Sequence, residues 1–312
     1  MKSVRSNVEG AFLAALTVLL YLASIYIPIL GFMLSFLSPL PVMFLVIRWN
    51  LRTGLMAAGV ASMLVFAFAG IMQALVCLLG FTTLGAAMGC MIKRKSSFFE
   101  VLGYTTVVSI LSKLALIGLA VLVTGVHPIT ANLEIMEEAF TRTSEIFGGV
   151  GLENFETLMN LIQMALPAIL IVASLIDTSL NFFLGSWAGR KIGITFPDHL
   201  PFERWRFPRS VFWMFALSWL LVMFGGEEGV GRVGLNLQMV TQMLFLVQGF
   251  SLAYFFLNKY IKTKGVTIGL LLLAFFQPFL TVVLSWAGIL DAWLDLRKLE
   301  TPPSSSGGGE KQ

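Results

Sequence analysis

The sequence is poor in charged residues. Asp, Glu, Lys and Arg make up 12% of its 312 residues, whereas a soluble globular domain carries about 25%. A soluble chain of this size must cover its surface with charged side chains, so the composition excludes a soluble enzyme. The high apolar content also excludes a disordered or collagen-like chain, and no nucleic-acid partner is expected.

The residues and motifs of soluble catalysis are also scarce. Cys77 and Cys90 lie on one apolar run, about 20 Å apart along a helix, which is too far for a disulfide. His127 and His199 are expected on opposite sides of a membrane, and the sequence has no HExxH and no Walker A motif. We therefore expect no catalytic residues, no metal site and no cofactor, in a chain that is not an enzyme.

One stretch matches the residue spacing of a nucleotide-binding motif without its structural context. Gly229, Gly231 and Gly234 have the spacing GxGxxG. In dinucleotide-binding proteins this pattern follows a strand and opens a βαβ unit. Here it lies between two apolar runs, so we expect a flexible connecting loop and no nucleotide.

Apolar residues are abundant. They make up 57% of the chain, which includes 27 Phe, 15 Met and 7 Trp, and the mean hydropathy is +0.86. The apolar runs are continuous rather than alternating, which excludes an outer-membrane barrel and predicts an all-α, polytopic transmembrane helix bundle. The nine candidate spans are 10–30, 32–47, 53–70, 72–92, 99–124, 160–188, 210–225, 235–258 and 267–290. If the second or the ninth run does not cross, the count falls to eight.

The distribution of Lys and Arg predicts the orientation. Most of the basic residues fall in segments that lie on one side if the N-terminus is cytoplasmic, as the positive-inside rule requires. The predicted organisation is a six-span membrane domain (1–190), a cytoplasmic interfacial strap (191–209), a three-span region (210–290) and a polar, disordered tail (291–312). The lipid bilayer is the expected partner.

The longest loop between spans, 125–158, is acidic and falls on the outer side in this orientation. Apolar residues recur along it at helical spacing, opposite its glutamates. This pattern predicts a short amphipathic helix on the membrane surface. The apolar positions are Leu133, Met136, Phe140 and Phe147.

Two charged residues fall within predicted spans. Lys113 lies near the middle of 99–124 and Asp177 near the middle of 160–188. A charge at the centre of a bilayer costs about 2.5–3.5 kcal/mol, so it is normally paired, and the predicted depths of the two residues differ by only about 5 Å. Their polar neighbours at helical spacing are Ser109, Ser112, Ser174, Thr178 and Asn181.

Two interpretations of this pair stay open. Lys113, Asp177 and Asn181 are candidates for a polar pocket that binds a solute or a proton. The alternative is a structural ion pair that fixes the register of the two helices. Both interpretations predict that the two charges meet in the interior of the bundle.

Three stretches of the N-terminal part carry a resemblance to a known family. They are Glu9-Gly-Ala-Phe-Leu-Ala-Ala-Leu, Ser38-Pro-Leu-Pro-Val-Met and Arg48-Trp-Asn-Leu-Arg-Thr-Gly-Leu-Met-Ala-Ala-Gly. They resemble the substrate-binding (S) components of energy-coupling-factor vitamin transporters, which are six-helix membrane proteins. The resemblance implies an S-component-like bundle over 1–190. It also implies that Ala11 and Ala15, as an AxxxA motif, contact a coupling membrane subunit that works with ATPases.

The whole chain also resembles the YybS-like family of uncharacterised bacterial multi-pass membrane proteins. The strap Pro197…Leu200-Pro201-Phe202…Trp205…Pro208, followed by an aromatic span, carries this likeness. It implies a multi-pass protein of the bacterial cytoplasmic membrane. The three spans after residue 210 and the long acidic loop depart from an S component, and no vitamin-binding residues match.

The expected function is therefore a small-solute-binding subunit of a transporter that needs a separate ATPase module, with the solute unknown. The alternative is a non-transporting membrane scaffold or regulatory protein whose partner is unknown.

Overall fold

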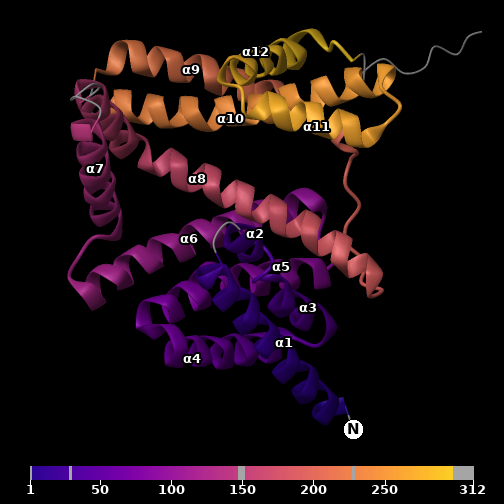
Figure 1. Ribbon diagram of the computed structural model, residues 1–312. Helices are drawn as coiled ribbons and strands as arrows, with labels where there is room; N and C mark the ends of the chain where they lie inside the picture. Colours follow the sequence, from indigo (N-terminus) through magenta and orange to yellow (C-terminus); the bar gives the residue numbers. More distant parts are fainter. Residues whose placement is uncertain (1, 28–29, 147–151, 227–228, 298–312) are drawn as a thin grey trace, which may run out of the picture. The chain divides into compact units, whose positions relative to one another are not determined.

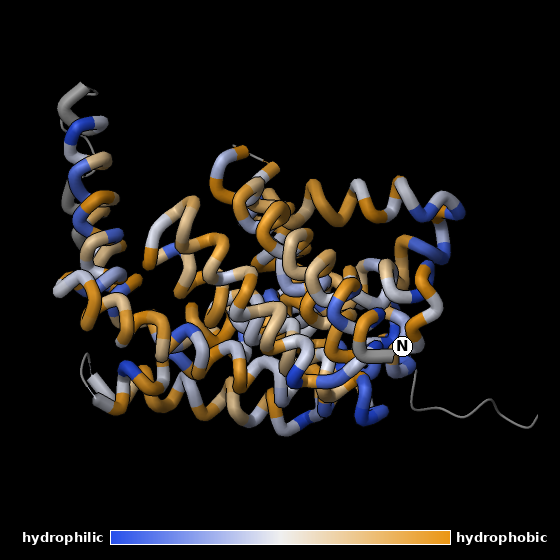
Figure 2. The backbone as a smooth tube through the Cα atoms, turned by 90° about the horizontal axis from the view of Figure 1, so that it is seen from below, coloured by the Kyte–Doolittle hydropathy of each residue, from blue (hydrophilic) through white to orange (hydrophobic). Residues whose placement is uncertain are grey.

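All the regular secondary structure in the described residues is helical. The computed structural model (Figure 1) describes residues 2–27, 30–146, 152–226 and 229–297, and these ranges contain no strand. Hydrophobic residues occupy most of the length of the helices (Figure 2). The expected all-α class is confirmed.

The chain forms two compact units. The first comprises Met1–Ile162 and Ile169–Asp198, and the second comprises Gln163–Ala168 and His199–Gln312. One long helix contributes residues to both units. Each unit is described by itself below.

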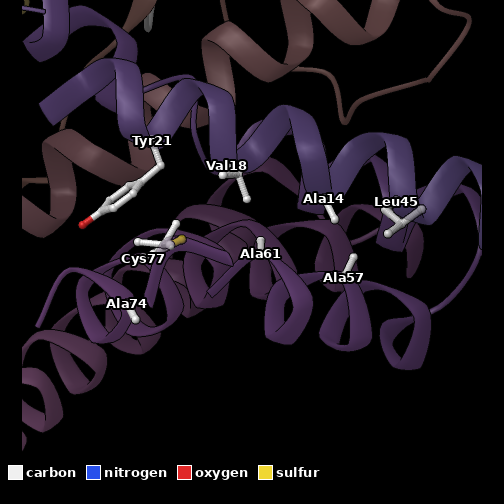
Figure 3. Close-up of a cluster of buried hydrophobic side chains, with 9 residues drawn as sticks. Ala14, Val18, Tyr21, Leu45, Ala57, Ala61, Ala74 and Cys77 are labelled. Carbon is white, nitrogen blue, oxygen red and sulfur yellow. The ribbon is translucent and has the colours of Figure 1, made fainter. Parts of the chain in front are cut away.

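The core of the first unit lies between its N-terminal helices. Helix α1 (Lys2–Tyr26) packs against α3 (Leu40–Arg48) and α4 (Leu51–Leu75), with the short helix α2 (Leu30–Ser35) between α1 and α3 in the chain. Figure 3 shows the side chains of α1 pointing towards small residues of α4. Alanines allow the helices to approach closely, as small residues do in membrane bundles. The labelled core residues are Ala14, Val18, Tyr21, Leu45, Ala57, Ala61, Ala74 and Cys77.

The third and fourth predicted spans lie in one continuous segment, Leu51–Lys93, of 43 residues. A straight helix of that length would measure about 65 Å. Instead, Gly70 interrupts the helix with φ 84° and ψ 175°, and Lys93 Nζ contacts the backbone oxygen of Trp49. The last residue of the segment therefore returns to its beginning, and the two arms form a hairpin.

The second arm of this hairpin contains a π-helix, η1 (Val76–Thr82), followed by α5 (Thr83–Lys93). Helix α5 packs on α3 through two glycines. A Cβ at Gly85 would collide with the backbone of Pro39, and one at Gly89 would lie 2.7 Å from the backbone oxygen of Met43. Only glycine permits this approach.

Three helices follow in the chain: α6 (Phe98–Thr124), α7 (Pro128–Ile146) and α8 (Leu152–Lys191). Ser97 begins α6 with a capping box to Glu100, which satisfies two free backbone N–H groups. Helix α7 confirms the helix predicted in the acidic loop, although Phe147 lies outside the described residues. With 40 residues, α8 begins well before the predicted span at residue 160.

A side chain of helix α10 (Val230–Tyr260) forms two hydrogen bonds with the backbone of α8. Asn236 Oδ1 accepts from Ala168 N at 2.8 Å, and Asn236 Nδ2 donates to Met164 O at 2.9 Å. These two backbone groups are four residues apart, as are the partners of a helical hydrogen bond. Pro167, one residue earlier, has no backbone N–H and cannot donate a helical hydrogen bond. Asn236 thus satisfies both groups where α8 passes through the second unit.

The predicted strap is non-helical apart from the turn η2 (Phe202–Arg204), and α9 (Arg209–Gly225) follows it. Helices α9 and α10 then pack closely. A Cβ at Gly231 would collide with Gly226 O, and one at Gly234 would lie 2.7 Å from Leu221 Cβ. The expectation that the GxGxxG stretch is a flexible loop is wrong, because two of its glycines lie in α10 at this contact.

The ninth predicted span is not one straight helix. Helices α11 (Lys264–Phe275) and α12 (Pro278–Leu294) are bent by 106° relative to each other. Gln277 has an extended backbone, with φ −102° and ψ 106°. The cause is Pro278, which disfavours a helical conformation in the residue before it.

Fewer helical segments than the eight or nine predicted spans qualify as single spans by length and composition. By length and composition, six helical segments in the described ranges can cross a membrane, or seven if the bent α11–α12 pair is one span. This count takes Leu51–Lys93 as one segment, although Gly70 divides it into the two arms of a hairpin, and it leaves out Arg209–Gly225, which is only 17 residues long. A span needs about 20 residues.

Candidate functional site

Helix α6 carries a polar stripe. With about 100° of rotation per residue, its polar side chains between 105 and 113 fall within an arc of about 120°. All of them are buried except Lys113, whose side chain is 24% exposed. Such a stripe is costly among lipids, so it turns towards protein or water. The residues are Thr105, Thr106, Ser109, Ser112 and Lys113.

Helix α8 carries a second stripe. Four polar side chains follow one another at helical spacing and fall within an arc of about 100°. Three are buried, with exposures of 0–2%, and the Asp177 side chain is 32% exposed. The residues of this stripe are Ser174, Asp177, Thr178 and Asn181.

The two stripes meet at an ion pair. Lys113 Nζ lies 2.8 Å from Asp177 Oδ2 and donates a second hydrogen bond, of 2.6 Å, to Ser109 Oγ. The predicted pairing of Lys113 with Asp177 is therefore confirmed. Both side chains keep part of their surface accessible, so the pair is not sealed in the core.

Polar atoms around the pair lack partners. Asn181 Nδ2 donates to the backbone oxygen of Asp177 at 2.9 Å, but Asn181 Oδ1 is buried without a hydrogen bond. Three hydroxyls of the stripes share this condition: those of Thr106, Ser174 and Thr178. A buried polar group without a partner costs about 1–3 kcal/mol. These groups can therefore receive hydrogen bonds from, or donate them to, a molecule at this site.

The ion pair is a compact polar site of opposite charges. In the described residues no group of three or more His, Cys, Asp or Glu side chains could hold a metal ion. The pair brings one carboxylate and one ammonium together, and they neutralise each other. Hydroxyl and amide groups lie on the same helix faces as the pair, and groups of this kind recognise a ligand by hydrogen bonds.

Ala11 and Ala15 are exposed on α1. The opposite face of this helix, which includes Gly10 and Ala14, packs within the unit; the nearest side chains to a Cβ at Gly10 belong to Thr53 and Leu45. Packing inside the first unit therefore leaves the Ala11/Ala15 face open. The structure does not bring these two alanines together with the polar stripes.

Sequence reasoning missed a second ion pair. Asp291 and Arg297 were expected in a disordered tail, but α12 extends to Leu294 and both side chains are 0% exposed. Arg297 Nη2 lies 2.6 Å from Asp291 Oδ2, and Gln248 Nε2 donates to the same oxygen at 2.9 Å. The tail boundary at 291 is therefore wrong, and residues 298–312 lie outside the described residues.

Arg297 also binds the backbone of the strap (191–209). Arg297 donates to the backbone oxygens of Glu203 and Trp205, at 2.7 and 2.8 Å, and to Ser251 Oγ at 2.8 Å. Ser251 donates in turn to Phe202 O at 2.6 Å. No local pattern in the sequence could have indicated this network, because its members come from three distant segments.

Together, the apolar helices and the paired charges among them define a polytopic α-helical membrane protein whose helices contact the lipid bilayer. The chain belongs to the family described as "Predicted membrane protein (DUF2232)", whose model matches residues 15–292. It is 24% identical, over 310 residues, to the "Uncharacterized protein YybS" of Bacillus subtilis. That match covers 95% of this chain and 99% of the relative. No solved structure matches the chain.

Proposed function

We propose that the chain is a membrane-embedded binding subunit for a small polar solute, and that the solute binds beside Lys113 and Asp177. The observation that carries the proposal is the set of four buried, unpartnered polar atoms along the stripes of α6 and α8. A purely structural pair needs no such groups around it, because each one destabilises the fold.

Transport would require a partner. The sequence has no P-loop, so a transport cycle would need a separate ATPase module. The open Ala11/Ala15 face of α1 is the proposed contact with a coupling membrane subunit, in line with the S-component resemblance. Small residues favour this role because they allow close backbone approach between helices.

We place the chain in a bacterial cytoplasmic membrane with its N-terminus in the cytoplasm, on the basis of its Lys and Arg distribution. Single cysteines introduced between 134 and 142 should react with an impermeant reagent in intact cells. A cysteine at position 94 should react only after the cells are opened, and reaction before that would overturn this orientation.

The proposal is tested by the small molecules that copurify with the full chain. The purified protein is denatured, and the released compounds are identified by mass spectrometry. Thr178→Val should lose the compound, because it removes a hydroxyl of the site. Thr267→Val is the matched control, because Thr267 is also 0% exposed with an unpartnered hydroxyl but lies on α11.

A compound retained by Thr267→Val and lost from Thr178→Val supports the site. The absence of any enriched compound in the wild-type protein, or equal loss from both variants, contradicts it. Copurification of a specific protein without a compound would favour the alternative, a membrane scaffold.

A further inference from the structure

The ends of several helices in the first unit converge at one place. Trp49, after α3, donates from Nε1 to Glu9 Oε2 of α1 at 2.8 Å. Lys93, at the end of α5, contacts the backbone oxygen of Trp49. Arg48 Nη2 approaches Ile192 O, just beyond α8, at 3.5 Å. These contacts assemble one surface from four separate parts of the sequence.

This surface, which we name the basic face, carries a strong excess of positive charge. Its acidic residues are Glu9 and Glu100. Glu9 lies near Arg5 and Arg48, and Glu100 is occupied in the capping box of α6. The basic residues are Arg5, Arg48, Arg52, Lys93, Arg94, Lys95, Arg190 and Lys191.

Three of these cations have no partner. In the part of the chain that the structure describes, Arg52, Arg94 and Lys95 are exposed and form no ion pair or side-chain hydrogen bond. The fold thus gathers like charges that repel one another and leaves them uncompensated. Such an arrangement attracts a polyanionic partner.

The surroundings of the basic face match the headgroup region of a membrane. Its cations lie at the ends of helices long and apolar enough to cross a bilayer. Lys191 Nζ lies 3.9 Å from the centre of the Trp187 ring, and this ring is 60% exposed. Tryptophan and basic side chains together mark the level where lipid headgroups begin.

We infer that the basic face is a docking surface for anionic phospholipid headgroups. Phosphate oxygens would be held by Arg52, Arg94 and Lys95, while the Arg48, Glu9 and Trp49 contacts hold the helix ends in register. Arginine suits this role because its planar guanidinium matches phosphate with two parallel hydrogen bonds. The inference is independent of the solute site.

The test measures lipid retention by the full-length chain. The protein is reconstituted with phosphatidylglycerol and phosphatidylcholine, partly delipidated, and analysed by native mass spectrometry. The test variant is Arg52→Gln/Arg94→Gln/Lys95→Gln. The matched control is Lys259→Gln/Lys262→Gln/Lys264→Gln. It removes three exposed cations, at the end of α10, in the connection and at the start of α11, that form no ion pair within the described ranges.

The wild-type protein should retain phosphatidylglycerol in preference to phosphatidylcholine, and added salt should weaken the preference. The test variant should reduce it about tenfold or more, since each basic residue near an anionic membrane contributes several-fold to binding. The control should reduce it about twofold at most. If the triple variant does not fold, Arg52→Gln and Arg94→Gln are measured singly, and each should reduce retention several-fold.

No preference for phosphatidylglycerol in the wild-type protein would overturn the inference, as would equal losses in the two triple variants. Soluble poly-glutamate provides the remaining arm, with the protein in phosphatidylcholine alone. If it competes away phosphatidylglycerol and binds more tightly than the lipid, the basic face belongs to an acidic protein, and the lipid assignment is wrong.

Discussion

The two units each hold an ion pair among apolar helices, and the pairs differ in how completely they are satisfied. Asp291 and Arg297 are 0% exposed, and backbone oxygens and polar side chains occupy the remaining donors of the arginine. Lys113 and Asp177 keep 24% and 32% of their side-chain surface accessible. Unpartnered hydroxyls lie on the same helix faces as Lys113 and Asp177.

This difference separates a structural role from a binding role. A sealed network in which every group has a partner fixes local geometry and has no capacity for a ligand. A pair that remains accessible beside unpartnered groups has that capacity, and it costs stability until it is filled. The Asp291–Arg297 pair is therefore assigned to fastening the strap, and the Lys113–Asp177 pair is proposed to bind solute.

The largest effect is expected from Arg297→Met. This change strands a fully buried carboxylate and frees the backbone oxygens of Glu203 and Trp205, so the free energy of unfolding should fall by about 3–5 kcal/mol. Thermal unfolding of the purified protein measures it. Arg142→Met is the control, because it breaks an exposed pair with Glu138 and should cost less than about 1 kcal/mol. Equal effects would contradict the structural role of Arg297.

A smaller loss is expected from Asn236→Leu. The change removes the two hydrogen bonds from Asn236 to the backbone of α8, each worth about 0.5–1.5 kcal/mol net, so the free energy of unfolding should fall by about 1–3 kcal/mol. Asn132→Leu is the control, because Asn132 is exposed on α7 and bonds only the backbone of its own helix. If thermal unfolding shows equal stability for the two variants, α8 does not depend on this contact.

A still smaller loss of stability is expected from breaking the Lys113–Asp177 pair. Asp177→Asn leaves the Lys113 ammonium without its counter-charge, and should lower the free energy of unfolding by about 1–2 kcal/mol, less than Arg297→Met because the site is partly accessible. The double variant Lys113→Met/Asp177→Leu should be more stable than Asp177→Asn. Thermal unfolding decides this, and a double variant that is less stable than the single one would refute a coupled pair.

The smallest effect on stability is expected at the exposed face of α1. Ala11→Leu/Ala15→Leu should leave thermal unfolding within about 0.5 kcal/mol of the wild type, because neither side chain packs inside the unit. If this face contacts a coupling subunit, the same variant should lose copurifying membrane proteins in a pull-down from its native membrane. Unfolding of the variant would contradict the exposed placement.

Hydropathy predicted much of the fold. The described parts of the apolar runs are largely helical, and the break between the third and fourth predicted spans lies at Gly70, whose positive φ suits glycine. The bend before Pro278 was not predicted. Composition detects apolar length, but it does not tell how far a glycine or a proline redirects the chain within an apolar run.

In the candidate site, only the pairing of the two charges could be predicted from the sequence. A charge in mid-span needs a partner, and Lys113 and Asp177 were the only two charges available at matching depth, so their pairing could be inferred. Asp291 and Arg297 looked like an ordinary polar tail, because nothing near them in the sequence indicates burial. Their role comes from Gln248 and from the strap, which only the folded chain brings to them.

The most direct test compares the two pairs by ligand content. Native mass spectrometry of the full chain should show a small-molecule adduct that Lys113→Met/Asp177→Leu abolishes. The matched double variant Asp291→Leu/Arg297→Met should keep the adduct even where its thermal stability differs from the wild type. An adduct that survives the first change and disappears with the second would contradict the assignment of the solute site to α6 and α8.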